Sequence, residues 1–208
     1  MPLSKGKEFE KHWKESWEKT PHYFLRLQDS AKWTSDGKTS FTPSNPYDGL
    51  AFASPILFTM ELKSVEGTGI SFNPGDPTKR PTNEKTHVMI KASQVKSLLA
   101  CHEKIGVVSG FIFNFRPRVL KTKTEPNETF FVFIDDFIRF AVQSGKSSIG
   151  RNDCRDIGIP ITGEVKKVHF KYDIDEFVFQ ATNMLFSKKP LDKETMLLQL
   201  GAFIQKYK

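Results

Sequence analysis

Cysteine is scarce in this chain, which has only Cys101 and Cys154 among its 208 residues. Neither belongs to a CxxC motif or lies at Cys/His ligand spacing, so the sequence predicts neither a structural zinc site nor a disulfide framework. Free, buried thiols fit a reducing compartment. The first 19 residues contain no apolar signal segment, and the densest apolar run, residues 130–134, is too short to cross a bilayer. We therefore expect a cytoplasmic protein without a membrane span.

Acidic residues are outnumbered, with 24 Asp and Glu against 31 Lys and Arg, giving a net charge of +7 and a pI near 9.3. This excess favours a polyanionic partner such as nucleic acid, although a merely soluble basic surface accounts for it equally well. The 38% of hydrophobic residues, including 19 Phe, excludes a disordered chain. The length fits one compact α/β domain, and neither a repeat nor a break in composition divides it.

The apolar patterns predict a single domain over residues 1–208 with three appendages. Residues 28–46 are polar and read as a projecting loop or short stalk, whereas residues 64–90 carry several Gly and Pro and read as a long mobile loop. Residues 173–208 form a C-terminal helical extension. The expected helices cover residues 5–19, 92–104, 135–143, 173–186 and 191–207, and the expected strands cover residues 23–27, 48–53, 56–63, 106–115, 129–135 and 164–172.

The first helix carries one aromatic stripe, because Phe9, Trp13 and Trp17 recur at every fourth position. Ser4 is a plausible N-cap. We expect the stripe to be buried in the core. At about 100° per residue, Glu10 then lies about 60° from the centre of the stripe, on the shoulder of the buried face. This acid is therefore positioned for a site, if the helix packs beside it.

The stretch NPYDGLAFASPILFTMELKS predicts a hairpin that turns at Ser54 and Pro55. A symmetric register pairs Asp48 with Glu61, with Cβ atoms about 5 Å apart. Alternation places Glu61 and Lys63 on one face, while the opposite face is wholly apolar and must pack inward. Two like charges facing each other are destabilising, so a cation should compensate for them.

Two cations can play this part, namely Lys63 and a divalent metal ion. Paired carboxylates offer the oxygen ligands that Mg²⁺ or Mn²⁺ prefers. A metal at Asp48 and Glu61, with Lys63 nearby, suits phosphodiester hydrolysis, because the metal polarises the phosphate and lowers the pKa of a bound water. The alternative is an ordinary salt bridge at the edge of a strand, which the spacing of these residues allows equally well.

At these residues the sequence resembles the PD-(D/E)XK nucleases, and most of all the RecU-type Holliday-junction resolvases, including phage-type members. The helix segment GKEFE ends at Glu10, the segment YDG contains Asp48, and ELK contains Glu61 and Lys63. The segment SQV places Gln94 at the start of the next helix. The E-x-K core is common to the whole superfamily, whereas the five-residue combination is more specific.

The resemblance covers residues 5–161 in order and implies a restriction-endonuclease-like mixed β-sheet flanked by helices. It implies that Asp48 and Glu61 bind Mg²⁺, with Mn²⁺ as a substitute, and that Lys63 acts on the nucleophile or the transition state. Glu10 and Gln94 would support the metal, its waters or the phosphate. The implied protein is a homodimer that makes paired nicks in a four-way DNA junction, in DNA recombination and repair.

Two other functions fit the same residues. The first is another PD-(D/E)XK nuclease, either restriction-type or associated with recombination. The second is a non-catalytic DNA-binding module in which the acids form a salt-bridged core. Cleavage of junction and duplex DNA with and without Mg²⁺ distinguishes the three.

Candidates for DNA contact are cationic side chains spread along the chain and one aromatic residue in a polar loop. Each cation has the alternative of being an ordinary surface charge, and Trp33 has the alternative of anchoring its loop. Arg26 stands out because its strand lies next to the presumed site. The candidates are Lys5, Lys7, Arg26, Trp33, Lys79, Arg80, Arg116, Arg118, Lys121 and Lys123.

Overall fold

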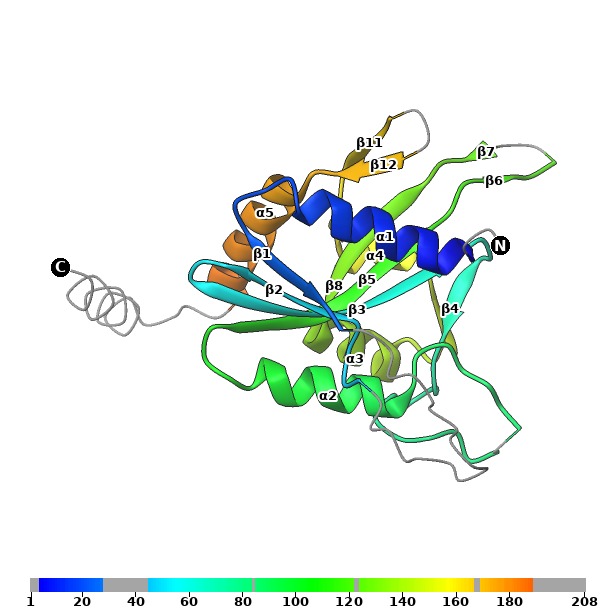
Figure 1. The fold of residues 1–208 in the computed structure, drawn as a ribbon. Helices are drawn as coiled ribbons and strands as arrows, with labels where there is room; N and C mark the ends of the chain where they lie inside the picture. The colour runs from blue at the N-terminus through cyan, green and yellow to red at the C-terminus, as the bar shows by residue number, and fades with distance from the viewer. Residues whose placement is uncertain (1–3, 28–44, 84, 122–123, 167–168, 189–208) are drawn as a thin grey trace, which may run out of the picture.

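A computed structural model describes residues 4–27, 45–83, 85–121, 124–166 and 169–188 (Figure 1). Its centre is a six-stranded mixed sheet in the order β1-β2-β3-β5-β8-β10. Strands β3 and β5 are parallel, and the other neighbouring pairs are antiparallel. The predicted α/β fold, a mixed sheet flanked by helices, is confirmed. The strands are β1 (Tyr23–Arg26), β2 (Gly49–Ala53), β3 (Ile56–Val65), β5 (Val107–Phe115), β8 (Glu128–Phe133) and β10 (Ile159–Pro160).

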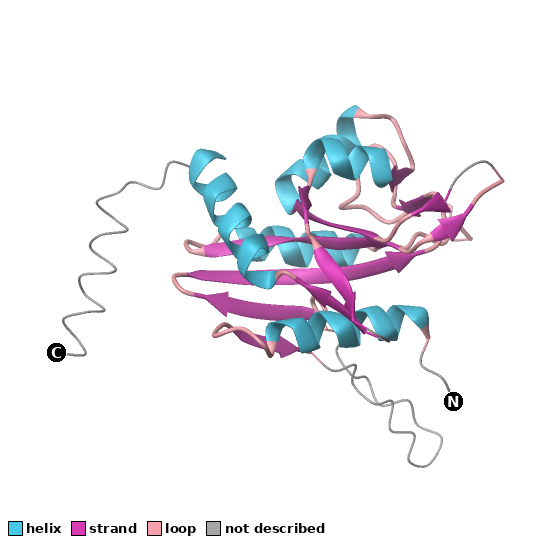
Figure 2. Cartoon of the chain, turned by 90° about the horizontal axis from the view of Figure 1, so that it is seen from above, coloured by secondary structure: helices cyan, strands magenta, loops and turns pink. Residues whose placement is uncertain are grey.

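Helices cover both faces of this sheet (Figures 1 and 2). On one face, α1 (Lys5–Trp17) and α5 (Ile174–Lys188) bury aromatic side chains against β3 and β8. On the other face, α2 (Ala92–His102), α3 (Ile134–Gln143) and α4 (Arg151–Ile157) enclose a second core around β5. Strand β3 is therefore covered on both faces, so its polar side chains are removed from water.

Helix α1 is built as the stripe predicts. The Ser4 side chain accepts a hydrogen bond from the Lys7 N–H at 3.4 Å and caps the first turn. Phe9, Trp13 and Trp17 are at most 5% exposed, and the helix ends at Trp17, two residues before the predicted end.

The β2–β3 hairpin has the predicted register, from Gly49 opposite Met60 to Ala53 opposite Ile56. The turn contains a cis Ser54–Pro55 peptide bond. Asp48 directly precedes β2, and its N–H donates to the Met60 carbonyl at 3.1 Å. The register thus carries Asp48 to the position opposite Glu61.

The predicted long loop over residues 64–90 contains a short strand in its first part. Strand β3 continues to Val65, and β4 (Gly69–Ser71) pairs with β9 (Ser148–Gly150). Ile70 and Phe72 are buried, at 0% and 1% exposure. A three-residue strand between Gly and Pro gives no usable periodicity, and its partner lies far away in the sequence.

Other expectations near the C-terminus also change. Residues 164–172 are not one strand but a hairpin of β11 (Gly163–Lys166) and β12 (His169–Tyr172). Helix α5 accounts for the first part of the predicted helical extension. The predicted stalk at residues 28–46 lies outside the described residues except for its last two positions, and the helix at 191–207 lies wholly outside them. None of the helices within the described ranges is long and apolar enough to cross a membrane.

Candidate active site

The fold brings the carboxyl groups of Asp48 and Glu61 together. Glu61 lies in β3 and is 2% exposed, which is unusual for an acid. The Asp48 Oδ2 atom accepts a hydrogen bond from the Leu62 N–H at 2.8 Å, which fixes its carboxylate beside β3. The negative charge of Asp48 acts on the Glu61 carboxyl group. This pair is the first part of the site.

Lys63 and Gln94 converge on a single oxygen of Glu61. The Lys63 Nζ atom donates to Glu61 Oε1 at 2.8 Å, and the Gln94 Nε2 atom donates to the same oxygen. The Gln94 Oε1 atom accepts from the Lys91 N–H at 2.9 Å at the start of α2. Gln94 is thus oriented by its own helix and in turn orients the Glu61 carboxylate.

The electrostatics of this pair are unbalanced. Burial raises the pKa of Glu61 to about 7; the positive charge of Lys63 opposes the increase, and the negative charge of Asp48 adds to it. Burial therefore outweighs the attraction of Lys63, and the ionised form of Glu61 is costly at this place. An added cation would stabilise both carboxylates, and their oxygens are the ligands that a hard divalent ion prefers.

Glu10 lies on the half-buried shoulder of α1, but it faces a cation. Its Oε2 atom accepts a hydrogen bond from the Arg26 Nη2 atom in an ion pair. Arg26 lies opposite Gly49 in the sheet, one position from Asp48. Within the described ranges, no group of three or more His, Cys, Asp and Glu side chains is arranged to hold a metal ion. The structure therefore does not gather Glu10 with the two acids, and Arg26, a predicted DNA contact, is engaged with Glu10.

The remaining cationic candidates lie on α1, on the loop over residues 72–91 and on the extension of β5. Several have an acidic partner: Lys5 pairs with Glu8 at 3.0 Å, Lys79 with Asp76 at 3.1 Å, Arg116 with Glu66 at 3.6 Å and Arg118 with Glu125 at 2.6 Å. Lys7, Arg80 and Lys121 are exposed. Trp33 and Lys123 lie outside the described residues.

One buried cation, Arg151, gave no signal in the sequence. It begins α4 and is 6% exposed. Its partners are far away in the sequence, so no local pattern could have identified them. The structure shows it at the base of the hairpin that extends β5 and β8.

Three comparisons place the chain among known proteins. No protein-family model matches the sequence. The sequence is 28% identical over 187 residues to the SPbeta prophage-derived uncharacterized protein YotM of Bacillus subtilis, with 83% of this chain and 84% of that protein covered. The structure is similar to that of Archaeoglobus fulgidus Hjc, a Holliday junction resolvase from an archaeal hyperthermophile, with a TM-score of 0.46, 13% identity, and coverage of 74% of this chain and 95% of that chain.

Proposed function

We propose that this chain is a Mg²⁺-dependent, structure-selective DNA endonuclease of the PD-(D/E)XK type, which resolves four-way junctions by paired nicks. The observation that carries the proposal is the pairing of half-buried Asp48 with buried Glu61, in which the Leu62 N–H holds Asp48 and Lys63 and Gln94 hold Glu61. A purely structural salt bridge between Glu61 and Lys63 gives no reason for a second acid, Asp48, beside it.

The acidic pair fits a hard divalent cation. Mg²⁺ is bound through one or two carboxylates, with water and substrate phosphate oxygens completing its shell, so a third protein acid is not required. Asp48 and Glu61 would hold the ion, and Mn²⁺ would substitute because it prefers the same oxygen ligands. Burial raises the pKa of Glu61, so its ionised form is costly, and a cation bound beside it would stabilise that form.

The chain's own residues have distinct parts in the reaction. When bound, the ion supplies Lewis-acid polarisation of the phosphate and a lower pKa for a bound water. Lys63, only 16% exposed, stabilises negative charge that develops on the phosphate or positions the attacking water. Gln94 fixes the Glu61 carboxylate. Glu10 and Arg26 tie α1 to the strand beside Asp48. Paired nicks need two such sites, so the active form would be a homodimer.

Cleavage of a synthetic four-way junction tests this proposal. With Mg²⁺ the purified protein should produce paired, symmetric nicks, and without divalent metal it should produce none. Asp48→Asn and Glu61→Gln should abolish cleavage while junction binding remains. Glu18→Gln, which removes a 56% exposed acid directly after the first helix, serves as the matched control. Undiminished cleavage by Asp48→Asn would refute the site.

The other outcomes separate the two alternative functions. Equal or faster cleavage of the linear duplex would identify a different nuclease of the same superfamily. A non-catalytic DNA-binding module would bind the junction but show neither cleavage nor metal binding by calorimetry.

A further inference from the structure

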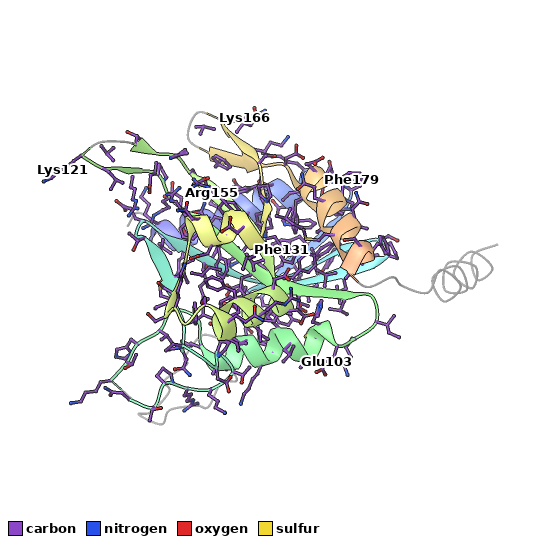
Figure 3. All side chains as sticks on the ribbon, turned by 180° about the vertical axis from the view of Figure 1, so that it is seen from behind. Glu103, Lys121, Phe131, Arg155, Lys166 and Phe179 are labelled. Atoms are coloured by element: carbon purple, nitrogen blue, oxygen red, sulfur yellow. The ribbon has the colours of Figure 1, made fainter. Side chains whose placement is uncertain are left out.

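The hairpin of β5 and β8 continues beyond the central sheet as a narrow projection. Its outer part consists of β6 (Arg118–Val119) and β7 (Thr124–Glu125). Both parts of the hairpin share one register: Phe115 lies opposite Glu128, and three residues further along each strand Arg118 lies opposite Glu125. We call residues 116–121 and 124–127 the arm. It projects from the sheet in Figure 1, and Figure 3 labels Lys121 at its end.

Two prolines interrupt this hairpin where the arm begins. The constant register places Pro117 opposite Pro126. Neither residue has an N–H, so the ladder cannot continue across this level. Arg151 bonds to both strands near this level: its Nη1 atom donates to the Pro126 carbonyl at 2.6 Å, in place of the N–H that Pro117 lacks, and its Nη2 atom donates to the Arg116 carbonyl at 2.5 Å. One side chain from α4 therefore bonds both strands at the base of the arm.

Arg151 is itself held firmly. Its guanidinium lies over the Phe115 ring at 5.5 Å, and it pairs with Glu128 at 2.8 Å and with Glu125 at 3.5 Å. Glu125 in turn pairs with Arg118 in the arm. Such charge-assisted bonds in a buried setting are stronger and more directional than neutral ones. The direction of the arm is thus set by this network rather than by a continuous ladder.

The outgoing strand of the arm carries only positive charge. Residues 116–121 contain Arg116, Arg118 and Lys121 and no acid. The acids of the returning strand, Glu125 and Glu128, are already paired with arginines. Lys121 is exposed at the tip, where a phosphate can reach it.

The reach of the arm can be read from the register. Glu61 lies opposite Phe111 in the parallel β3–β5 ladder, and the tip of the arm begins eight residues further on, at Val119. At about 3.3 Å per residue this separation is about 26 Å, which corresponds to about 8 base pairs of B-form DNA. A duplex whose scissile phosphate lies at Glu61 would therefore extend as far as the tip.

We infer that the arm is a DNA-backbone clamp that contacts duplex about 8 base pairs from the cut, and that Arg151 is the positioning residue that fixes its direction. The inference rests on the proposed function, because it places the scissile phosphate at Glu61. Phosphate contacts of this kind orient a duplex without reading its sequence. The clamp can contact a junction only when the DNA duplex is long enough to reach the tip of the hairpin.

Binding measured without divalent metal tests the clamp separately from cleavage. The probes are two four-way junctions whose loop-closed arms are about 6 and about 16 base pairs long, chosen to fall on either side of the expected reach. Lys121→Ala should lower the salt dependence of binding, the slope of log K against log salt, by about 0.9 on the long-armed junction and leave it unchanged on the short-armed one. Lys14→Ala, which removes a 51% exposed lysine on α1, should change neither slope.

Two results overturn the clamp. The first is an unchanged slope for Lys121→Ala on the long-armed junction. The second is an equal decrease of the slope on both junctions, because Lys121 would then contact DNA close to the cut. If Lys121→Ala lowers the slope on the long-armed junction but the protein does not cleave DNA, the proposed function is rejected and the clamp is kept. If the protein cleaves the junction but Lys121→Ala leaves the slope unchanged, only the clamp is rejected.

The positioning role of Arg151 needs a readout of geometry. Spin labels on Lys11→Cys and Lys121→Cys, in a Cys101→Ser background, report the direction of the arm, since Cys154 is buried. Arg151→Lys keeps the charge but has one nitrogen atom in place of Nη1 and Nη2, so it loses the planar fork that bonds the two carbonyls. The distribution of distances between the two labels should therefore broaden, and the salt dependence of binding to the long-armed junction should fall, while binding to the short-armed junction is kept. An unchanged narrow distribution contradicts the role. If Arg151→Lys does not fold, Lys121→Ala still tests the clamp.

Discussion

Glu61 should make the protein less stable as the pH rises toward neutrality. Its pKa is raised from 4.5 to about 7, mainly by burial. Between these two values the folded state keeps a proton that the unfolded state has released, so the unfolded state binds fewer protons and the free energy of unfolding falls as pH increases. The contribution is fully present below about pH 4.5 and is lost once the pH has passed about 7.

The size of this effect follows from the shift. At 1.36 kcal/mol per pKa unit, a rise from 4.5 to about 7 corresponds to a loss of about 3 kcal/mol of stability. Glu61→Gln cannot ionise and should remove this pH dependence. Mg²⁺ should have the same effect in the wild-type protein, because an ion bound to the ionised pair stabilises only the folded state.

Urea denaturation at closely spaced pH values between about 4 and 8 measures the effect, with the wild-type protein, Glu61→Gln and Glu18→Gln compared under the same conditions. Glu18→Gln should follow the wild-type curve, since its side chain is 56% exposed. A Glu61→Gln curve that falls in parallel with that of the wild type would refute the reasoning. So would a curve that Mg²⁺ leaves unchanged at pH 8, since the acids would then not form a cation site.

Two further substitutions test the surroundings of the pair. Gln94→Ala removes the donor to Glu61 and the acceptor for the Lys91 N–H; we expect a loss of about 10–100-fold in Mg²⁺ affinity or cleavage rate, measured by titrating cleavage with Mg²⁺ while DNA binding is kept. Trp13→Ala empties a fully buried position whose ring centroid lies 5.3 Å from that of Tyr172. It should lower the free energy of unfolding, measured in urea, by about 3–5 kcal/mol without changing the pH range over which Glu61 acts.

Much of the site could be predicted because it depends on short-range geometry. A tight hairpin fixes its own register, so the spacing of Asp48 and Glu61 around one turn determined that they face each other. The apolar reverse face of β3 made a one-residue shift costly, because it would move Met60 and its neighbours to the other side. Gln94 was found from the resemblance, and its position at the start of α2 explains how it reaches Glu61.

The rest depended on contacts that the sequence does not encode locally. A helical wheel gives the direction of Glu10 but not its distance from Asp48, and its pairing with Arg26 depends on how α1 packs on the sheet. The short strand β4 was missed because its partner β9 lies far along the chain. Arg151 was missed for the same reason, since its carbonyl partners come from another hairpin.

Glu61 and Glu128 differ in how their surroundings compensate for a negative charge. Burial alone would raise the pKa of Glu128, but hydrogen bonds from Arg151 and Arg155 outweigh it and hold the pKa below its usual value. Burial also acts on Glu61, yet there the single Lys63 is outweighed and the pKa rises to about 7. A structural network satisfies its own charges, because an uncompensated buried charge costs stability. Glu61 has one lysine and an acidic neighbour, whereas Glu128 has two arginines, which is the reason to look for a cation and a phosphate at Glu61 and not at Glu128.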